Sequence, residues 1–450
     1  MIGRTIVVGG GLAGLSAAWS LSRSGGDVEV LEASGRPGGV VRTERRSGFL
    51  LELGPNTVRP TAPLWHLVSA LGLSGEAVFA DPRAARYVDF SGELHLLPMR
   101  PTALLRSRLL STSGKWRLVT ESFRRSAPVD NESVADFVRR RLGPEAAERL
   151  VEPFVAGVFA GSASRLSVAA AFPRLARWER ESGSLLLGAL ADRRRTPTPA
   201  VPLPRGLLSF REGLETLPRA IAVALGGAFR PGAAVTAVAP KTGGGWTAHL
   251  GAERREADRI VLAVPAHAAA RLVQGFAPDA AAALSAIPHP PLAILHLSWP
   301  AAALRRPLDG FGHLVCPDPA RRILGAVWSS SLFAGRAPSG RVLLTVFLGG
   351  TRDPDAASLT DDALTAAAAR DLEAEGLVRG DPDRVLVTRW EEAIPQYEQG
   401  HEGRLATLAA AEGRWPGLTF LGNYRGGVSV GEVVASGLAA AASLLGGRGL

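Results

Sequence analysis

The feature that most constrains this chain is a glycine-rich turn near its N-terminus. A G-x-G-x-x-G motif is formed by Gly9, Gly10, Gly11, Leu12, Ala13 and Gly14. The apolar run at 4–9 predicts a strand before the turn, and the pattern over 12–24 predicts a helix after it. Glycines let the backbone approach a pyrophosphate, and the helix N-terminus attracts that anion. The turn therefore predicts a Rossmann-like, dinucleotide-binding unit.

The residues after the next predicted strand favour a flavin over a nicotinamide. Glu32 ends the strand at 28–32, where its carboxylate can accept hydrogen bonds from adenosine ribose hydroxyls. A second loop follows at once and contains Arg36, Gly38, Gly39 and Val40. A second glycine pair is unnecessary for NAD, but it suits a longer cofactor whose pyrophosphate and ribityl chain run past two loops. We therefore predict FAD.

Two further segments fit a flavin ring. The first is a turn that can press backbone against a planar ring, formed by Gly54, Pro55, Asn56 and Thr57. The second precedes a predicted C-terminal helix and includes Asn423, Val428, Ser429 and Val430. A helix N-terminus aimed at the flavin pyrimidine stabilises negative charge on the reduced ring. This predicts that the last helix packs back on the N-terminal unit.

Composition excludes several classes of protein. The chain has 450 residues, of which 46% are hydrophobic and 21% charged, so it is globular and large enough for about two or three domains. Cys316 is the single cysteine, which leaves no intrachain disulfide and no cysteine cluster for a metal. We predict no metal site. A spanning helix needs about 20 apolar residues without a break, and the long weakly charged stretch of this chain is interrupted by prolines. Any membrane contact should therefore be peripheral.

The charge is concentrated in one block. The chain carries a net charge of +9, and residues 96–205, with 19 basic and 10 acidic residues, account for all of it. The block has helical spacing and ends in a Pro-rich stretch at 196–205, which reads as a linker. Its arginine runs, such as Arg139–Arg141, are typical of solvated faces, and the bias toward arginine over lysine is typical of genome composition. We therefore expect no nucleic-acid partner.

Several motifs resemble the flavin amine oxidase superfamily: E-A-x-x-R-x-G-G at 32–39, E-L-G-P at 52–55 and the glycine-rich segment at 422–437. Four more resemble the branch of that superfamily that oxidises porphyrinogens. They are P-F-V-A-G-V-F-A-G-x-x-x-x-L-S (153–167), S-L-L-L-G (184–188), G-F-G-H-L-V (310–315) and I-P-Q-Y-x-x-G-H (394–401). The resemblance spans nearly the whole chain.

The resemblance implies an α/β (α+β) fold with three parts. A Rossmann-like FAD-binding domain would be assembled from 1–85, 206–265 and 385–450. A mixed-sheet, substrate-binding domain would contain 86–95 and 266–384. Residues 96–205 would form a helical membrane-binding insert, whose arginines and apolar faces dock on anionic lipid.

The resemblance also implies a reaction, the oxidation of protoporphyrinogen IX to protoporphyrin IX in haem biosynthesis. Six electrons leave in three flavin cycles, and molecular oxygen becomes hydrogen peroxide. Two alternatives stay open: oxidation of coproporphyrinogen III to coproporphyrin III, and another oxidase or desaturase of the superfamily. A lysine-dependent amine oxidase is disfavoured, because Lys115 and Lys241 are the only lysines and neither is expected on a substrate-domain strand. Because the flavin carries the chemistry, we predict no catalytic side chain.

Further site residues follow from the resemblance alone. Val235 would meet the adenine through its backbone, and Trp390 would contact the cofactor. Arg86 would bind a substrate propionate through its forked guanidinium, although a surface arginine is the alternative. Phe311 would pack on a pyrrole ring, or simply in the core, and Gly157 would belong to a loop lining the substrate pocket. The implied location is cytoplasmic, peripheral on the cytoplasmic face of the membrane; a homodimer and a contact with ferrochelatase are allowed but not decided.

Overall fold

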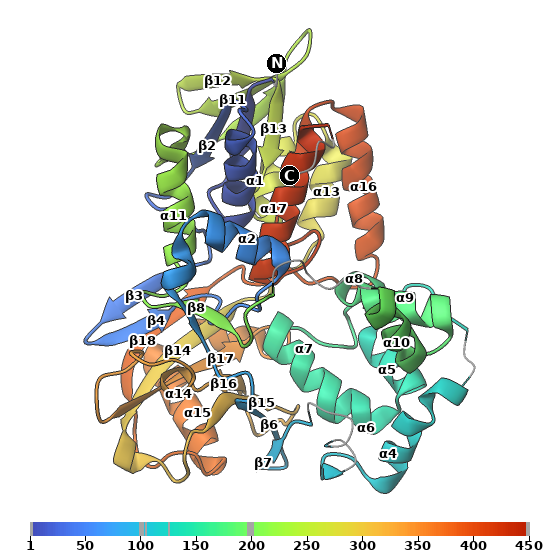
Figure 1. The fold of residues 1–450 in the computed structure, drawn as a ribbon, viewed down its shortest axis with the longest axis vertical. Helices are drawn as coiled ribbons and strands as arrows, with labels where there is room; N and C mark the ends of the chain where they lie inside the picture. Colours follow the sequence, from blue (N-terminus) through green and yellow to red (C-terminus); the bar gives the residue numbers. More distant parts are fainter. Residues whose placement is uncertain (1–2, 99–102, 104–105, 125–126, 196–201, 447–450) are drawn as a thin grey trace.

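The computed structural model describes residues 3–98, 103, 106–124, 127–195 and 202–446. Figure 1 shows three parts: a parallel sheet between helices, a second sheet below it, and a group of helices beside that sheet. The mixed α/β fold class predicted from the sequence is confirmed. Residues 196–201 of the predicted linker lie outside the described ranges.

The parallel sheet has five strands in the order β19-β13-β1-β2-β9. Alternate residues of β1 face opposite sides, so Val7 joins one core and Ile6 and Val8 join the other. Helices cover both faces, as a parallel sheet requires. The strands are β1 (Thr5–Val8), β2 (Val28–Glu32), β9 (Phe229–Pro231), β13 (Arg259–Leu262) and β19 (Leu418–Phe420). The helices are α1 (Leu12–Arg23), α2 (Ala62–Ala70), α11 (Thr216–Leu225) and α17 (Val430–Leu444) on one face, and α12 (Ala266–Val273), α13 (Pro278–Ser285) and α16 (His401–Arg414) on the other.

The last helix packs against the first, as predicted. A Cβ atom on Gly437 of α17 would lie 2.4 Å from the carbonyl oxygen of Ala13 of α1, so glycine permits this close crossing. A hairpin after β9 gains a third strand and forms a small sheet. That small sheet contains β10 (Ala237–Pro240), β11 (Trp246–Leu250) and β12 (Glu253–Ala257). Two short pairs, β3 (Thr43–Arg46) with β4 (Phe49–Glu52) and β5 (Ala77–Phe79) with β8 (Leu208–Phe210), complete this part.

The second sheet has seven strands in the order β18-β14-β17-β16-β15-β6-β7. Neighbours are antiparallel except β6 and β15, which run parallel. The strands are β6 (Ala85–Phe90), β7 (Glu93–Leu96), β14 (Leu292–Pro300), β15 (Gly310–Val315), β16 (Ile323–Val327), β17 (Arg341–Gly349) and β18 (Asp383–Trp390). Helices α14 (Ser329–Leu332) and α15 (Asp361–Ala374) accompany them.

Two segments lie on the other side of the predicted domain boundaries. β18 pairs with β14, so residues 385–390 belong to the seven-stranded sheet rather than to the flavin part. Helices α12 and α13 pack on the five-stranded sheet and not on the substrate side, because their alanine-rich faces fill the core under Ile6 and Val8. The sequence placed the boundary at 385 about 6 residues too early and the boundary at 266 about 20 residues too early.

The helical insert contains short helices around their own apolar core. Ser133 caps α5 by accepting a hydrogen bond from the amide of Asp136, and Pro144 begins α6. The elements are α4 (Thr112–Val119), η2 (Glu121–Phe123), α5 (Val134–Arg141), α6 (Pro144–Ala146), η3 (Ala147–Val151), α7 (Glu152–Phe159), α8 (Val168–Ala171), α9 (Pro173–Ser182) and α10 (Leu185–Arg195). Along the part of the chain that the structure describes, no helix has both the length and the apolar character needed to cross a bilayer.

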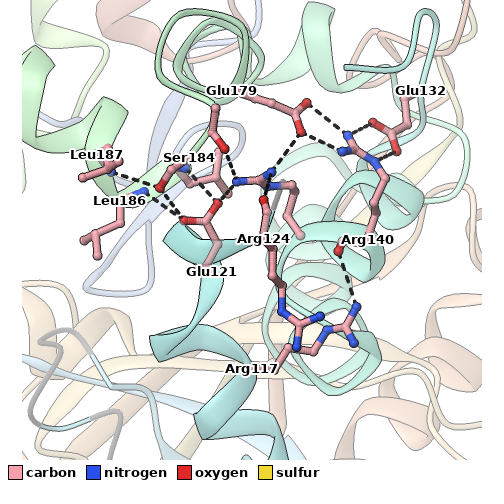
Figure 2. Close-up of polar contacts among 12 residues, drawn as sticks. Arg117, Glu121, Arg124, Glu132, Arg140, Glu179, Ser184, Leu186 and Leu187 are labelled. Carbon is pink, nitrogen blue, oxygen red and sulfur yellow. Dashed lines mark hydrogen bonds and ion pairs between the residues drawn. The ribbon is translucent and has the colours of Figure 1, made fainter. Parts of the chain in front are cut away.

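Arginines of the predicted solvated run face inward (Figure 2). The guanidinium of Arg140 lies 2.6 Å from Glu132 and 2.7 Å from Glu179. Arg141 is fully buried, pairs with Glu121 and donates to the carbonyl of Gly183. Arg139 alone of the run stays at the surface, beside Asp136. The expectation that this run is solvated is therefore wrong for two of its three arginines, because carboxylates of the same block compensate them.

Candidate active site

The turn between β1 and α1 has the geometry of an anion-binding loop. Gly9 has a φ of +109°, and a Cβ on Gly14 would lie 2.2 Å from the carbonyl oxygen of Gly9. Among the described residues no side chain caps the N-terminus of α1 at Gly11, and a Cβ there would meet nothing within 4 Å. Unsatisfied amide groups beside open space fit the pyrophosphate of a dinucleotide.

The second glycine loop packs directly on the first. The amide of Gly38 donates to the carbonyl of Gly10 at 2.8 Å, and Gly39, with a φ of +58°, lies over the Cα of Gly11. Arg36 donates to the carbonyl of Gly39 at 2.7 Å, so its guanidinium braces the loop from within. The two predicted cofactor loops thus form one surface.

Glu32 lies where the adenosine half of the cofactor is expected. One carboxylate oxygen accepts from the amide of Gly10 at 2.6 Å and the other from the amide of Ser34 at 2.8 Å. A carboxylate has about four acceptor positions, so it can still accept from ribose hydroxyls. The amide of Ala233 donates to the carbonyl of Glu32 at 2.8 Å, which brings Val235 to the same end of β2. Val235 lies just before β10.

The Gly54 segment crosses the second loop and reaches the other sheet. A Cβ on Gly54 would lie 2.1 Å from the carbonyl oxygen of Val40. The indole of Trp390, the last residue of β18, donates to the carbonyl of Leu53 at 2.8 Å. The side chain of Asn56 folds back to the carbonyl of Gly54, and Pro55 and Thr57 are half-buried. This segment therefore joins the flavin part to the seven-stranded sheet.

The C-terminal loop meets the same region. A small apolar cavity in this part is lined by Leu12 of the first glycine loop and Val430 of α17, together with Val41 and Val58, which directly follow the other two predicted segments. Ser429 caps α17 in a capping box with Glu432, so its amide and hydroxyl serve the helix. A Cβ on Gly431 would lie 3.0 Å from the side chain of Thr61, which places the α17 N-terminus beside the end of the Gly54 segment. Segments about 400 residues apart thus converge.

The predicted substrate residues gather on the seven-stranded sheet. Arg86 on β6 pairs in register with Gly312 on β15, and its Cζ lies 5.4 Å from the ring centre of Phe311. Burial lowers the pKa of Arg86, and the positive charge of Arg59 lowers it further. Arg59, which sequence reasoning missed, follows the Gly54 segment directly. Two cations therefore lie near the edge where flavin and substrate parts meet.

Gly157 lies in helix α7 and not in a loop, which corrects the prediction. A Cβ there would lie 2.2 Å from the side chain of Leu314 on β15, so this glycine lets the helix approach the sheet. Phe154 and Val158 share its face of α7 and are 42% and 41% exposed. An apolar helix face therefore stands open beside β15.

Sequence reasoning also missed a set of residues that hold the C-terminal loop. The hydroxyl of Tyr397 contacts the backbone of Asn423 and Gly427, and His401 contacts the carbonyl of Tyr424. The motif at 394–401 was the available signal, but it indicated a family and not a role. The two lysines are absent from this region: Lys241 pairs with Glu256 in the hairpin, and Lys115 lies on α4.

The fold and the glycine loops together define the class of protein, a flavin-dependent oxidoreductase. Comparison with known families agrees, because the family described as flavin containing amine oxidoreductase matches residues 12–445. The cofactor is FAD, and the glycine loops fit it.

Individual relatives narrow the class. The chain is 38% identical to the chloroplastic protoporphyrinogen oxidase of Oryza sativa subsp. japonica, over 95% of this chain and 85% of that protein. It is 36% identical to the protoporphyrinogen oxidase of Homo sapiens, over 99% of both. A provisionally assigned protoporphyrinogen oxidase from Exiguobacterium sp. 255-15 shares the fold, with a TM-score of 0.80, 24% identity and 98% coverage of both chains. The chain belongs to the flavin-containing amine oxidoreductases, in the branch formed by the protoporphyrinogen oxidases.

Proposed function

We propose that this protein oxidises protoporphyrinogen IX to protoporphyrin IX, with oxygen as the electron acceptor and hydrogen peroxide as the product. The observation that carries the proposal is the convergence of two sites. The N-terminus of α17 lies beside Thr61, and Trp390 ties the Gly54 segment to the sheet that carries Arg86 and Phe311. The names of the relatives supply the substrate.

The substrate side suits a tetrapyrrole. Phe311 and the open face of α7, with Phe154 and Val158, offer apolar surface to a large macrocycle. The guanidinium of Arg86 matches the planar carboxylate of a propionate, and Arg59 adds a second positive charge. These groups bind and orient the substrate at the flavin edge.

The reaction needs orientation more than acid–base catalysis by side chains. When bound, FAD supplies a two-electron acceptor that oxygen can reoxidise. Six electrons and six protons leave the porphyrinogen, and three oxygen molecules become three molecules of hydrogen peroxide. The chain holds the macrocycle through Arg86 and Phe311. The positive N-terminal end of α17 would stabilise negative charge on the reduced flavin ring, which favours electron transfer to the flavin.

An aerobic fluorescence assay tests the substrate. Purified, FAD-loaded protein is mixed with protoporphyrinogen IX and, in parallel, with coproporphyrinogen III. We expect porphyrin fluorescence to rise with the first substrate at a higher kcat/KM than with the second. A clear preference for coproporphyrinogen would overturn the substrate, and no oxidation of either would overturn the reaction.

We further propose that the helical insert docks on a membrane surface, on the cytoplasmic face. Trp116, Val119 and Phe123, in or just after α4, are 68%, 52% and 85% exposed. Leu186 and Leu187 of α10 are 51% and 49% exposed. The two groups are neighbours, because Glu121 accepts hydrogen bonds from the amides of Leu185 and Leu186. Exposed apolar side chains of this kind enter the boundary between lipid headgroups and acyl chains.

Vesicle sedimentation tests this docking. Phe123→Ser combined with Leu187→Ser should weaken binding to anionic vesicles several-fold. The matched control is Val223→Ser on α11, because Val223 is 81% exposed but lies outside the insert. An equal loss of vesicle binding in the double variant and in the control would contradict the proposal that the exposed apolar side chains of the insert form the membrane-docking surface. Equal binding of the wild-type protein to neutral and anionic vesicles would contradict a role for the arginines. A homodimer and a ferrochelatase contact stay predictions.

A further inference from the structure

One segment contacts both the flavin part and the helical insert. We name residues 394–402, which follow β18 and include the first two residues of α16, the brace segment. Its sequence motif, I-P-Q-Y-x-x-G-H at 394–401, indicates the family but assigns no role to its residues. In the structure its side chains hold the C-terminal loop on one side and the end of α7 on the other.

Tyr397 and His401 hold the loop. The Tyr397 hydroxyl donates to the carbonyl of Asn423 and accepts from the amide of Gly427 at 3.0 Å. Nε2 of His401 lies 3.0 Å from the carbonyl oxygen of Tyr424. The two rings stack, with centres 4.4 Å apart and planes 12° apart, and both side chains are buried. Three backbone groups of one short loop are thus fixed by two stacked rings.

The protonation states of the two rings are fixed. Burial lowers the pKa of His401 to about 4, so the ring is neutral near pH 7. A neutral imidazole can donate to a carbonyl through Nε2 only when its proton is there, and Nδ1 has no partner among the described residues. Burial raises the pKa of Tyr397, which keeps its hydroxyl a donor. The contacts therefore persist across neutral pH.

The same segment reaches the substrate side. The amide of Gln396 lies against α7, because its Nε2 donates to the carbonyl of Phe159 at 2.7 Å. A Cβ on Gly161 would lie 2.2 Å from the Gln396 side chain, so the fit is tight. The amide of Ser167 donates to the carbonyl of Tyr397 at 2.8 Å. The brace segment therefore fixes the C-terminal loop relative to the helix that carries the open apolar face.

We propose that Tyr397 is a positioning residue for the flavin. Its hydroxyl holds the loop Asn423–Val428, and through it the N-terminus of α17, against the ring. The loop needs this support, since Gly426 and Gly427 have φ of +87° and +121° and impose little stiffness. Without the hydroxyl, the carbonyl of Asn423 and the amide of Gly427 both lose a partner. The proposal rests on the cofactor site proposed above.

Tyr397→Phe tests it, because the ring and its stacking stay while the hydroxyl goes. We expect kcat to fall about five- to tenfold, as for a lost hydrogen bond, with KM changed less than about twofold. The reduction potential of the bound FAD should become more negative, because the positive end of α17 moves off the ring. Tyr424→Phe is the matched control: it removes the hydroxyl of an equally buried tyrosine, whereas the contacts to the Asn423 carbonyl and the Gly427 amide belong to Tyr397.

An unchanged potential and kcat in Tyr397→Phe would overturn the proposal, as would an equal change in the control. If the variant purifies without FAD, the potential is measured after saturation with added FAD. If it does not fold, His401→Phe, which removes the other donor but keeps a planar ring, must shift the potential in the same direction. The potential needs no porphyrinogen, so its result is separate from failure of the proposed reaction.

Discussion

Two groups of arginines in this protein have opposite surroundings. In the helical insert, Arg140 pairs with Glu132 and Glu179 (Figure 2), and the fully buried Arg141 pairs with Glu121. In the candidate active site, Arg86 lies over the ring of Phe311, and the charge that most affects it is another cation. The first group holds helices together, whereas the second is the group that we propose binds a substrate carboxylate.

The comparison shows that charge counted along the sequence is a poor guide to binding. The block 96–205 carries the whole net charge of the chain, yet two arginines of the run Arg139–Arg141 form internal ion pairs. A half-buried arginine in a nearly neutral region is the better candidate for a ligand contact, because burial strengthens its interaction with an anion.

Breaking the buried pair should have the largest effect. Arg141→Leu leaves Glu121 buried without its cation, and we expect a loss of about 3–5 kcal/mol in the free energy of unfolding. Arg139→Leu, which removes a surface partner of Asp136, should cost less than about 1 kcal/mol. Chemical denaturation followed by the fluorescence of the insert's tryptophans compares the two. Similar losses of unfolding free energy in the two variants would contradict a larger stabilising role for the buried Arg141–Glu121 pair.

The same network should make the insert sensitive to acid. Burial raises the pKa of Glu121, but hydrogen bonds from Leu185, Ser184 and Arg141 outweigh it and hold the pKa below the ordinary 4.5. A carboxylate with a depressed pKa in the folded state contributes stability above about pH 4.5, and that stability is lost as the pH falls below it. Melting temperatures between pH 7 and pH 3 should therefore fall more steeply in the wild-type protein than in Glu121→Gln. Parallel curves would contradict this.

Substitutions of Arg86, on the substrate side, should weaken substrate binding and leave the fold intact. Arg86→Ala should raise KM roughly 10- to 100-fold, the range for a hydrogen bond to a charged group, with the FAD content unchanged. Arg86→Lys keeps the positive charge but loses the forked pair of N–H donors, so its KM should lie between those of the wild-type protein and Arg86→Ala. Steady-state kinetics measures KM, and the ratio of flavin absorbance to protein absorbance measures the FAD content. A variant that instead loses FAD would show that Arg86 serves the cofactor.

The smallest change is expected at Arg59. This side chain is exposed, so Arg59→Ala should raise KM about two- to fivefold without destabilising the fold. The increase should shrink at high salt, since screening weakens exposed charges. If KM is unchanged at low salt, Arg59 makes no contact with a substrate carboxylate.

Local features of the site were predictable, because a glycine turn needs a backbone conformation that neighbouring residues encode. Gly9–Gly14, Glu32 and the Gly38–Gly39 pair all lie where the motifs placed them. Tyr397 and Arg59 were not found, since their roles depend on contacts with residues far away in the chain. Gly157 illustrates the limit: a family motif identified the residue, but only packing against Leu314 shows that it belongs to a helix.

The most direct test of the account is an anaerobic titration of the oxidised protein with protoporphyrinogen IX. Oxygen is excluded, so electrons from the substrate stay on the flavin. The account predicts that the FAD absorbance bleaches and that one porphyrin forms for every three flavins reduced, because six electrons leave in pairs. Flavin that stays oxidised in excess substrate would contradict the central claim.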